Sequence, residues 1–148
     1  MAVYTTAAEE EAYFTTRLNT TPYDDATTAD KLAARTMATK AFEQLNYVGE
    51  MADEDQDLQF PRGDDTAIPQ VIKDACCEEM LNLLDGADPQ IEFENLGLVS
   101  ERYANINARH DPTSPSEHIA AGITSVTAWR LLLPFLRDGR AIRVERIS

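Results

Sequence analysis

The stretch that constrains the fold most is residues 68–86, IPQVIKDACCEEMLNLLDG. Pro69 suits the first position of a helix, where its missing N–H is no loss. Apolar residues then recur at helical spacing, and Gly86 ends the pattern as a C-terminal glycine does. The sequence therefore predicts a long amphipathic helix, whose buried stripe consists of Val71, Ile72, Ala75, Cys76, Met80, Leu83 and Leu84.

Two helices are predicted before this one. Thr6 and Glu9 have the spacing of a capping box, which predicts a helix over about 7–18. A threonine at 27 or 28 caps the second helix, predicted over about 29–47 with Gly49 as its C-cap. Its predicted buried positions are Leu32, Ala33, Met37, Ala41, Leu45 and Val48.

After residue 86 the pattern changes. Residues 87–107 lose the helical period and are predicted to be extended, and the polar stretch 109–117 is predicted to be an exposed loop. A further helix is predicted over about 124–137, which Pro134 should kink or shorten. Residues 141–147 alternate apolar and polar side chains, which predicts a short strand.

These elements predict one mainly α domain over residues 1–148. It is a bundle of about four helices with a small extended segment and a C-terminal strand or tail. The helical core covers about 6–86 and 124–137, the region over about 87–123 projects from it, and 138–148 forms a separate docking segment.

Charge limits the possible functions. The chain has 13 basic and 26 acidic residues, and its net charge is -13. A protein that grips duplex DNA needs a basic surface to release counterions, so this function is disfavoured. Residues 101–148 nevertheless carry seven of the bases and five of the acids, which indicates a macromolecular partner at this end. The alternative is that these arginines are ordinary solvent-exposed side chains of a helix and a strand and bind no partner.

No catalytic, cofactor or metal site is predicted. The acids from Asp53 to Asp57 begin like a calcium loop, but its glycine and glutamate positions hold Leu58 and Asp64. The adjacent cysteines at 76 and 77 are expected to be small apolar helix residues, one facing inward and one less so.

The remaining candidate side chains are expected to be structural. His110 and His118 are expected at the surface, because no other metal ligand accompanies them. Trp129 is expected in the core rather than as a stacking platform. Acidic helix faces are expected to be solvated. No apolar run is long enough to span a membrane and no signal peptide is evident, so the protein is expected to remain in the cytoplasm.

Residues 50–68 form a long segment without helical period. Leu58, Phe60, Pro61 and Arg62 are expected to anchor this loop, because long loops in compact domains are usually held by their own side chains. Arg62 is expected to meet acids of its own or a neighbouring subunit. An ordinary tether within one subunit is an equal alternative.

Several motifs together carry a family resemblance: the acidic segment 9–14, the LNYVGE stretch at 45–50, DQDLQFPR at 55–62, and Ile68 with Pro69. They resemble the head-to-tail adaptor proteins of tailed bacteriophages. Many such sequences are catalogued as DnaT-like single-stranded-DNA-binding proteins. The resemblance covers nearly the whole chain, and residues 107–124 depart from it.

The resemblance implies a ring, commonly of twelve copies, under the portal protein of the virion and assembled in the host cytoplasm. A tail or further connector protein binds its other end, packaged double-stranded DNA passes through the lumen without specific binding, and no membrane or cofactor takes part. The charge reversal adds the hypothesis that the C-terminal segment docks on the portal. Its residues are Arg137, Arg140, Ile142, Arg143, Val144, Arg146 and Ile147.

Two other functions remain open at this stage. One is a replication accessory that binds single-stranded DNA, which the acidity and the lone tryptophan disfavour. The other is a small acidic helical interaction protein without a role in the virion.

Overall fold

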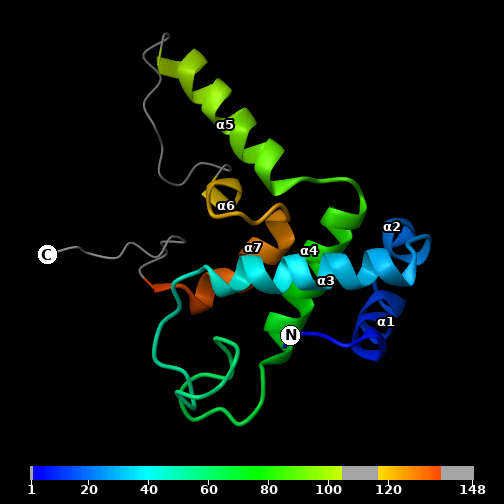
Figure 1. Cartoon of the computed structure of the whole chain (residues 1–148), viewed down its shortest axis with the longest axis vertical. Helices are drawn as coiled ribbons and strands as arrows, with labels where there is room; N and C mark the ends of the chain where they lie inside the picture. Colours follow the sequence, from blue (N-terminus) through cyan, green and yellow to red (C-terminus); the bar gives the residue numbers. More distant parts are fainter. Residues whose placement is uncertain (1, 105–116, 138–148) are drawn as a thin grey trace, which may run out of the picture.

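The computed structural model describes residues 2–104 and 117–137, which form seven α-helices and one 3-10 helix (Figure 1). The α-helices are α1 (Ala7–Thr15), α2 (Thr21–Asp24), α3 (Thr28–Glu43), α4 (Gln70–Leu84), α5 (Pro89–Ala104), α6 (Glu117–Ala120) and α7 (Val126–Leu132). The 3-10 helix η1 (Leu133–Phe135) follows α7 directly. The prediction of a mainly α fold is confirmed.

α4 is the central helix of the body. α1, α2, α3 and α7 all pack against it, and α5 projects from the body with α6 beside it (Figure 1). All seven residues from Ala75 to Leu81 are buried. A helix that is covered on every side buries whatever its sequence places there, polar residues included.

Side-chain caps fix the starts of three helices. The Thr6 hydroxyl accepts a hydrogen bond from Glu9 N, and the Glu9 carboxylate accepts one from Thr6 N, which completes the predicted capping box. Thr27 caps α3 through Asp30 N at 3.1 Å, as predicted for this end. Ser125 caps α7 in the same manner.

The predicted buried face of the second helix is only partly right, because Leu45 is buried and Ala41 half-buried but the other predicted residues are exposed. Leu32 is 54% exposed and Met37 is 46% exposed. The buried face instead carries Ala34, Ala38 and Phe42, spaced four residues apart. Small alanine side chains let α3 approach α4 closely, so the alanine face packs and the larger residues remain outside.

The predicted ends of the second and third helices also need correction. α3 ends at Glu43 with Gln44 as its C-cap, so Gly49 is not a cap. Val48 lies beyond the helix and is 47% exposed. Pro69 is the N-cap of α4 rather than its first residue, and Val71 is 39% exposed.

The predicted extended segment over 87–107 is wrong as well, because its described part is the helix α5. Ile91 is 55% exposed and Phe93 is 56% exposed. Residues two positions apart point to nearly opposite sides of a helix. Ile91 and Phe93 therefore do not share one stripe, which obscures the period by which an amphipathic helix is recognised.

The other helix ends differ by a few residues. α1 ends at Thr15, before the predicted end near 18, and α2 lies in a segment for which no helix is predicted. The helix predicted over about 124–137 is divided into α7 and η1, so Pro134 shortens it as predicted. Most of the predicted loop at 109–117 and the predicted strand at 141–147 lie outside the described residues.

The cysteines and one histidine are more buried than predicted. Cys76 is 0% exposed and Cys77 is 1% exposed, so both face inward. Burial raises the pKa of the Cys76 thiol to about 12. His118 is 6% exposed, and its Nδ1 lies 2.8 Å from the carbonyl oxygen of Ile123. His110 lies outside the described residues.

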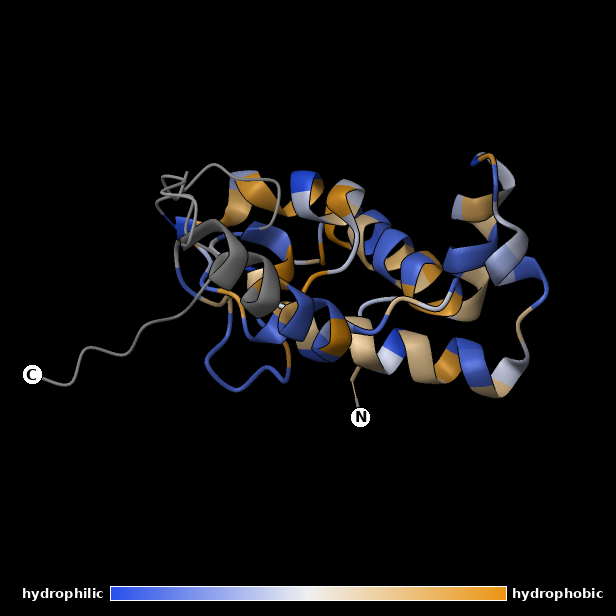
Figure 2. Ribbon diagram, turned by 90° about the horizontal axis from the view of Figure 1, so that it is seen from above, coloured by the Kyte–Doolittle hydropathy of each residue, from blue (hydrophilic) through white to orange (hydrophobic). Residues whose placement is uncertain are grey.

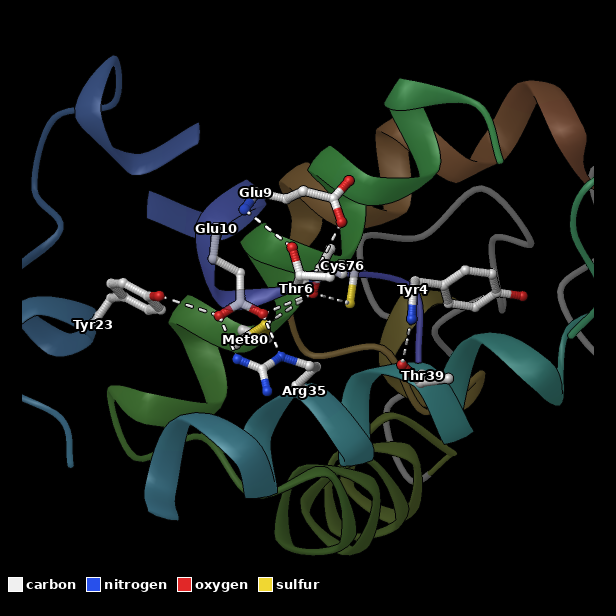
Figure 3. Close-up of polar contacts among 10 residues, drawn as sticks. Tyr4, Thr6, Glu9, Glu10, Tyr23, Arg35, Thr39, Cys76 and Met80 are labelled. Atoms are coloured by element: carbon white, nitrogen blue, oxygen red, sulfur yellow. Dashed lines mark hydrogen bonds and ion pairs between the residues drawn. The ribbon is translucent and has the colours of Figure 1, made fainter. Parts of the chain in front are cut away.

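Glu10 is a fully buried carboxylate with partners from three segments (Figure 3). It accepts hydrogen bonds from Thr5 Oγ1 at 2.8 Å, Tyr23 OH at 3.1 Å and Arg35 Nη2 at 2.8 Å. The hydrogen bond to Glu10 raises the pKa of the Arg35 guanidinium. Glu10 therefore joins α1 to α2 and α3.

Two more carboxylates are buried on α4. Glu78 accepts from Arg17 Nε at 3.0 Å and from Tyr13 OH at 2.8 Å. Glu79 accepts from the backbone N–H groups of Thr124 and Ser125, at 3.0 Å and 2.9 Å. Burial raises the pKa of Glu79, and the bonds from these N–H groups oppose the rise. The expectation that acidic helix faces are solvated is wrong for these residues.

We expect Glu10→Ala to lower the free energy of unfolding by about 3 kcal/mol, because it leaves the Arg35 guanidinium without its carboxylate. Urea unfolding followed by circular dichroism measures this. Glu11→Ala, an exposed residue of the same helix, is the matched control and should change stability by less than about 0.5 kcal/mol. Equal effects of the two changes would contradict this account.

Candidate functional site

The loop between α3 and α4 is folded onto the body by Phe60. This side chain is 2% exposed and packs among aromatic rings. The centroid of the Tyr47 ring lies 4.6 Å from that of Phe60, and that of Phe135 lies 5.6 Å away, both edge to face. Leu58 is partly buried against the same core. The structure thus places Phe60 where a loop anchor was expected.

Arg62 closes the loop through its guanidinium. It donates to the carbonyl oxygen of Val48 at 2.9 Å and to the carbonyl and amide oxygens of Gln59 at 3.2 Å and 2.9 Å. These partners are not the acids that the sequence predicted, because the main chain turns at Gly49 and presents its carbonyls to Arg62. Burial lowers the pKa of this guanidinium.

Backbone bonds complete the loop around Pro61. Ala52 N donates to the Pro61 carbonyl at 3.0 Å, and Gly63 N donates to that of Glu50 at 2.9 Å. The amide of Gln56 also donates to Pro61 O, at 2.8 Å. Two segments of the loop, around residues 50–52 and 61–63, are therefore held side by side by these bonds and by an isolated antiparallel bridge between Met51 and Arg62.

Glu43 ties the loop to the N-terminal segment. Its carboxylate accepts from the hydroxyl of Tyr4, which is 1% exposed, and from Gln59 N at 3.1 Å. Burial raises the pKa of Tyr4, and the bond to Glu43 raises it further. Glu43 thus accepts hydrogen bonds from two segments that are far apart in sequence.

The end of the described chain is paired with the start of this loop. Val48 N donates to Phe135 O at 2.8 Å, and Arg137 N donates to Asn46 O at 3.0 Å. Tyr47 and Leu136 form an antiparallel bridge between these bonds. The structure therefore brings together the two sets of residues that the sequence singled out, namely the loop anchor and Arg137, which begins the predicted docking segment.

We call this region the loop end; it comprises residues 44–68 and 135–137. The other predicted docking residues, Arg140, Ile142, Arg143, Val144, Arg146 and Ile147, lie outside the described residues. Arg137 itself is exposed. It lies close enough to Arg62 for its charge to contribute to the lowered pKa of that residue.

The loop end carries strongly negative charge. Seven carboxylates of the loop are exposed: Glu50, Asp53, Glu54, Asp55, Asp57, Asp64 and Asp65. Because Phe60 and Arg62 hold the backbone, these charges stay concentrated on one protruding segment. Such a surface repels phosphates and attracts basic groups.

The aromatic rings are placed in the interior. Trp129 is 6% exposed, as its predicted core position requires. Tyr4, Tyr23, Tyr47 and Phe60 are each at most 2% exposed. Of the aromatic side chains that the structure describes, Phe93 alone counts as exposed, whereas single-strand binding proteins stack successive bases on several exposed rings.

The described residues offer neither a metal site nor a membrane-spanning helix. Over residues 2–104 and 117–137 no group of three histidine, cysteine or acidic side chains is placed to hold a metal ion. The described helices are all too short or too polar to cross a bilayer. In the acidic stretch that begins like a calcium loop, the Asp53 carboxylate instead accepts a hydrogen bond from the backbone, since its Oδ1 lies 2.9 Å from Asp55 N.

Sequence reasoning missed the pairing of residues 46–48 with 135–137 and the role of Glu43. Neither leaves a local signal, because the partners lie far apart in sequence. The aromatic residues at 47, 60 and 135 were the available clue.

A family model described as "Putative DnaT-like ssDNA binding protein" matches residues 2–147. No curated protein and no solved structure matches the chain. The match includes the loop end and α5.

We expect Phe60→Ala to lower the free energy of unfolding by about 3 kcal/mol, because it empties a fully packed aromatic site. The loop should then be cut faster by a protease that acts after acidic residues. Leu18→Ala, at a position that is 82% exposed, is the control and should change neither property measurably. A Phe60→Ala protein as stable as the parent would show that the loop is not anchored by this residue.

Proposed function

The chain belongs to the family described as putative DnaT-like ssDNA binding proteins, and we propose that it serves as a head-to-tail adaptor of a tailed phage. In this proposal about twelve copies form a ring under the portal. The ring joins the portal to the tail or to a further connector protein, and packaged DNA passes through its lumen. The protein is then a structural component of the virion, without catalytic activity.

The observation that carries the proposal is the construction of the loop end. Phe60, Arg62 and Glu43 fix a loop with seven exposed carboxylates. Arg137 lies directly beside it, held by the bond from its N–H to Asn46. One rigid end of the molecule thus combines a concentrated negative surface with the start of an arginine-bearing segment.

A negative surface suits a passage for DNA. A duct that DNA must traverse should not bind phosphates, since each neutralised phosphate releases counterions and adds affinity. With a net charge of -13 per copy, a ring would repel the duplex unless its few bases lined the lumen. This supports transit without specific binding.

The arginines suit a different partner. Between residues 137 and 148 there are four arginines against Asp138 and Glu145. Guanidinium groups form paired hydrogen bonds with carboxylates, and an alternating segment can add to the edge of a sheet in another protein. Both properties support docking of this segment on the portal.

The second candidate function is a replication accessory that binds single-stranded DNA. The description of the matching family favours it. Its physical requirements are a basic groove and exposed rings for base stacking. The acidic loop and the burial of Trp129 and six other described aromatic residues count against it.

Affinity capture of the tagged protein from infected cells, followed by mass spectrometry, tests the two candidates. Portal and tail proteins in the eluate would support the adaptor. Replication proteins whose capture is abolished by nuclease would support the accessory instead. Virions that lack the protein would overturn the adaptor proposal.

Charge reversal at the C-terminal segment tests the docking surface. We expect replacement of Arg140, Arg143 and Arg146 by glutamate to abolish capture of the portal, because repulsion replaces three attractive contacts. Replacement of the same residues by lysine is the matched control, and it should retain measurable binding because the charge is kept. Portal binding that survives deletion of residues 138–148 would refute docking through this segment.

Binding of a fluorescent single-stranded oligonucleotide, measured by anisotropy at low salt, tests the accessory directly. We expect no saturable binding at micromolar protein, because the net charge and the buried rings oppose it. Tight binding that weakens steeply with added salt would favour the accessory over the adaptor.

A further inference from the structure

The solvent-facing side of α3 is unusually apolar. We define the α3 outer face as Ala29, Leu32, Ala33, Thr36, Met37 and Lys40, which the helical repeat places on the side opposite the buried alanines. Five of these residues are exposed and Thr36 is half-buried. α3 runs along the lower edge of the body in Figure 2, where orange and pale segments alternate with blue ones.

This face differs from an ordinary helix surface. Among its six residues only Lys40 is charged, in a chain with 26% charged residues. Solvent-facing helix positions usually carry charged or polar side chains. Ala29, Ala33 and Thr36 are small, so another helix can approach closely between the larger Leu32 and Met37.

The described first half of α5, residues 89–96, carries a second set of exposed apolar side chains. It projects from the body (Figure 1), and in its described side chains Ile91 and Phe93 are both more than half exposed. They lie on opposite flanks of the helix. An isolated helix of this length is marginal in water and depends on packing, so α5 has an apolar surface that a partner would stabilise.

The two surfaces have opposite local charge. Lys40 belongs to the α3 outer face, and it takes part in none of the three ion pairs found among the described residues. Asp88, just before α5, and Glu94, next to Phe93, are both exposed acids. A contact between the α3 outer face and the first half of α5 would therefore bury apolar side chains and also bring opposite charges together.

We propose that the first half of α5 packs on the α3 outer face of a second copy of this chain. The occupant is a second copy because one contact of this kind covers the α3 outer face and one flank of α5 at once, with Lys40 opposite exposed acids. The contact joins two different surfaces, so it is heterologous, and repetition produces a closed ring or an open filament. The inference rests on the proposed ring and names the surfaces that build it.

Charge reversal tests the contact through sedimentation velocity at about 1 mM protein and an ionic strength of about 0.15 M, which screens the long-range repulsion between the acidic copies. Lys40→Glu and Glu94→Lys should each weaken self-association about tenfold, because each places like charges together. The double variant Lys40→Glu with Glu94→Lys should restore it to within about threefold of the parent, since every contact again pairs opposite charges.

An apolar variant gives an independent measurement. Met37→Glu should weaken self-association more than either charge reversal, because it places a charge in the apolar centre of the contact. Val126→Glu is the matched control, since Val126 is 45% exposed but lies on α7. It should leave self-association unchanged. Circular dichroism confirms that each variant is folded before it is compared.

Several outcomes overturn the inference. They are a parent protein that stays monomeric at this concentration, a double variant no better than the single ones, or equal effects of Met37→Glu and Val126→Glu. The result is independent of portal capture. If the portal is captured but the double variant does not restore self-association, the α3–α5 contact is refuted and the adaptor proposal stands. If the double variant restores self-association but no portal is captured, the contact stands and the adaptor proposal is refuted.

Discussion

A carboxylate that moves from water into a protein interior loses several kcal/mol of solvation unless other groups replace the water. This constraint governs the arrangement of helices around α4. Glu10 is matched by Arg35 of α3, Glu78 by the segment after α1, and Glu79 by the turn before α7. Because each carboxylate is satisfied in one arrangement only, the polar contacts select the way in which the apolar faces pack.

Local chemistry was predictable from the sequence, whereas the choice of packing partner was not. The caps at Thr6 and Thr27 involve residues three positions apart, so their signal is complete within one turn. The buried face of α3 was missed because Leu32 and Met37 are more apolar than the alanines that pack. α5 was missed because Ile91 and Phe93 lie on opposite flanks and obscure the helical period in its first half.

The same distinction applies to the candidate site. Phe60 was identifiable as an anchor, since a large apolar residue in a polar loop needs a place to be buried. Its neighbours Tyr47 and Phe135 are brought to it by main-chain bonds between residues 46–48 and 135–137. Such a pairing depends on the whole fold. The acids that Arg62 was expected to meet are exposed instead, because carbonyl oxygens occupy its donors.

The two proposed interactions use different residues: docking uses the segment that begins at Arg137, whereas the contact between copies uses the α3 outer face and α5, which projects from the body away from the loop (Figure 1). Docking and contact between copies can therefore occur together, as a ring under a portal requires. Both must also overcome repulsion between copies that each carry a net charge of -13. Salt screens this long-range repulsion and so favours assembly, whereas it weakens binding to nucleic acid by removing the gain from counterion release. The sign of the salt dependence consequently separates a ring-forming acidic adaptor from a single-strand binding protein.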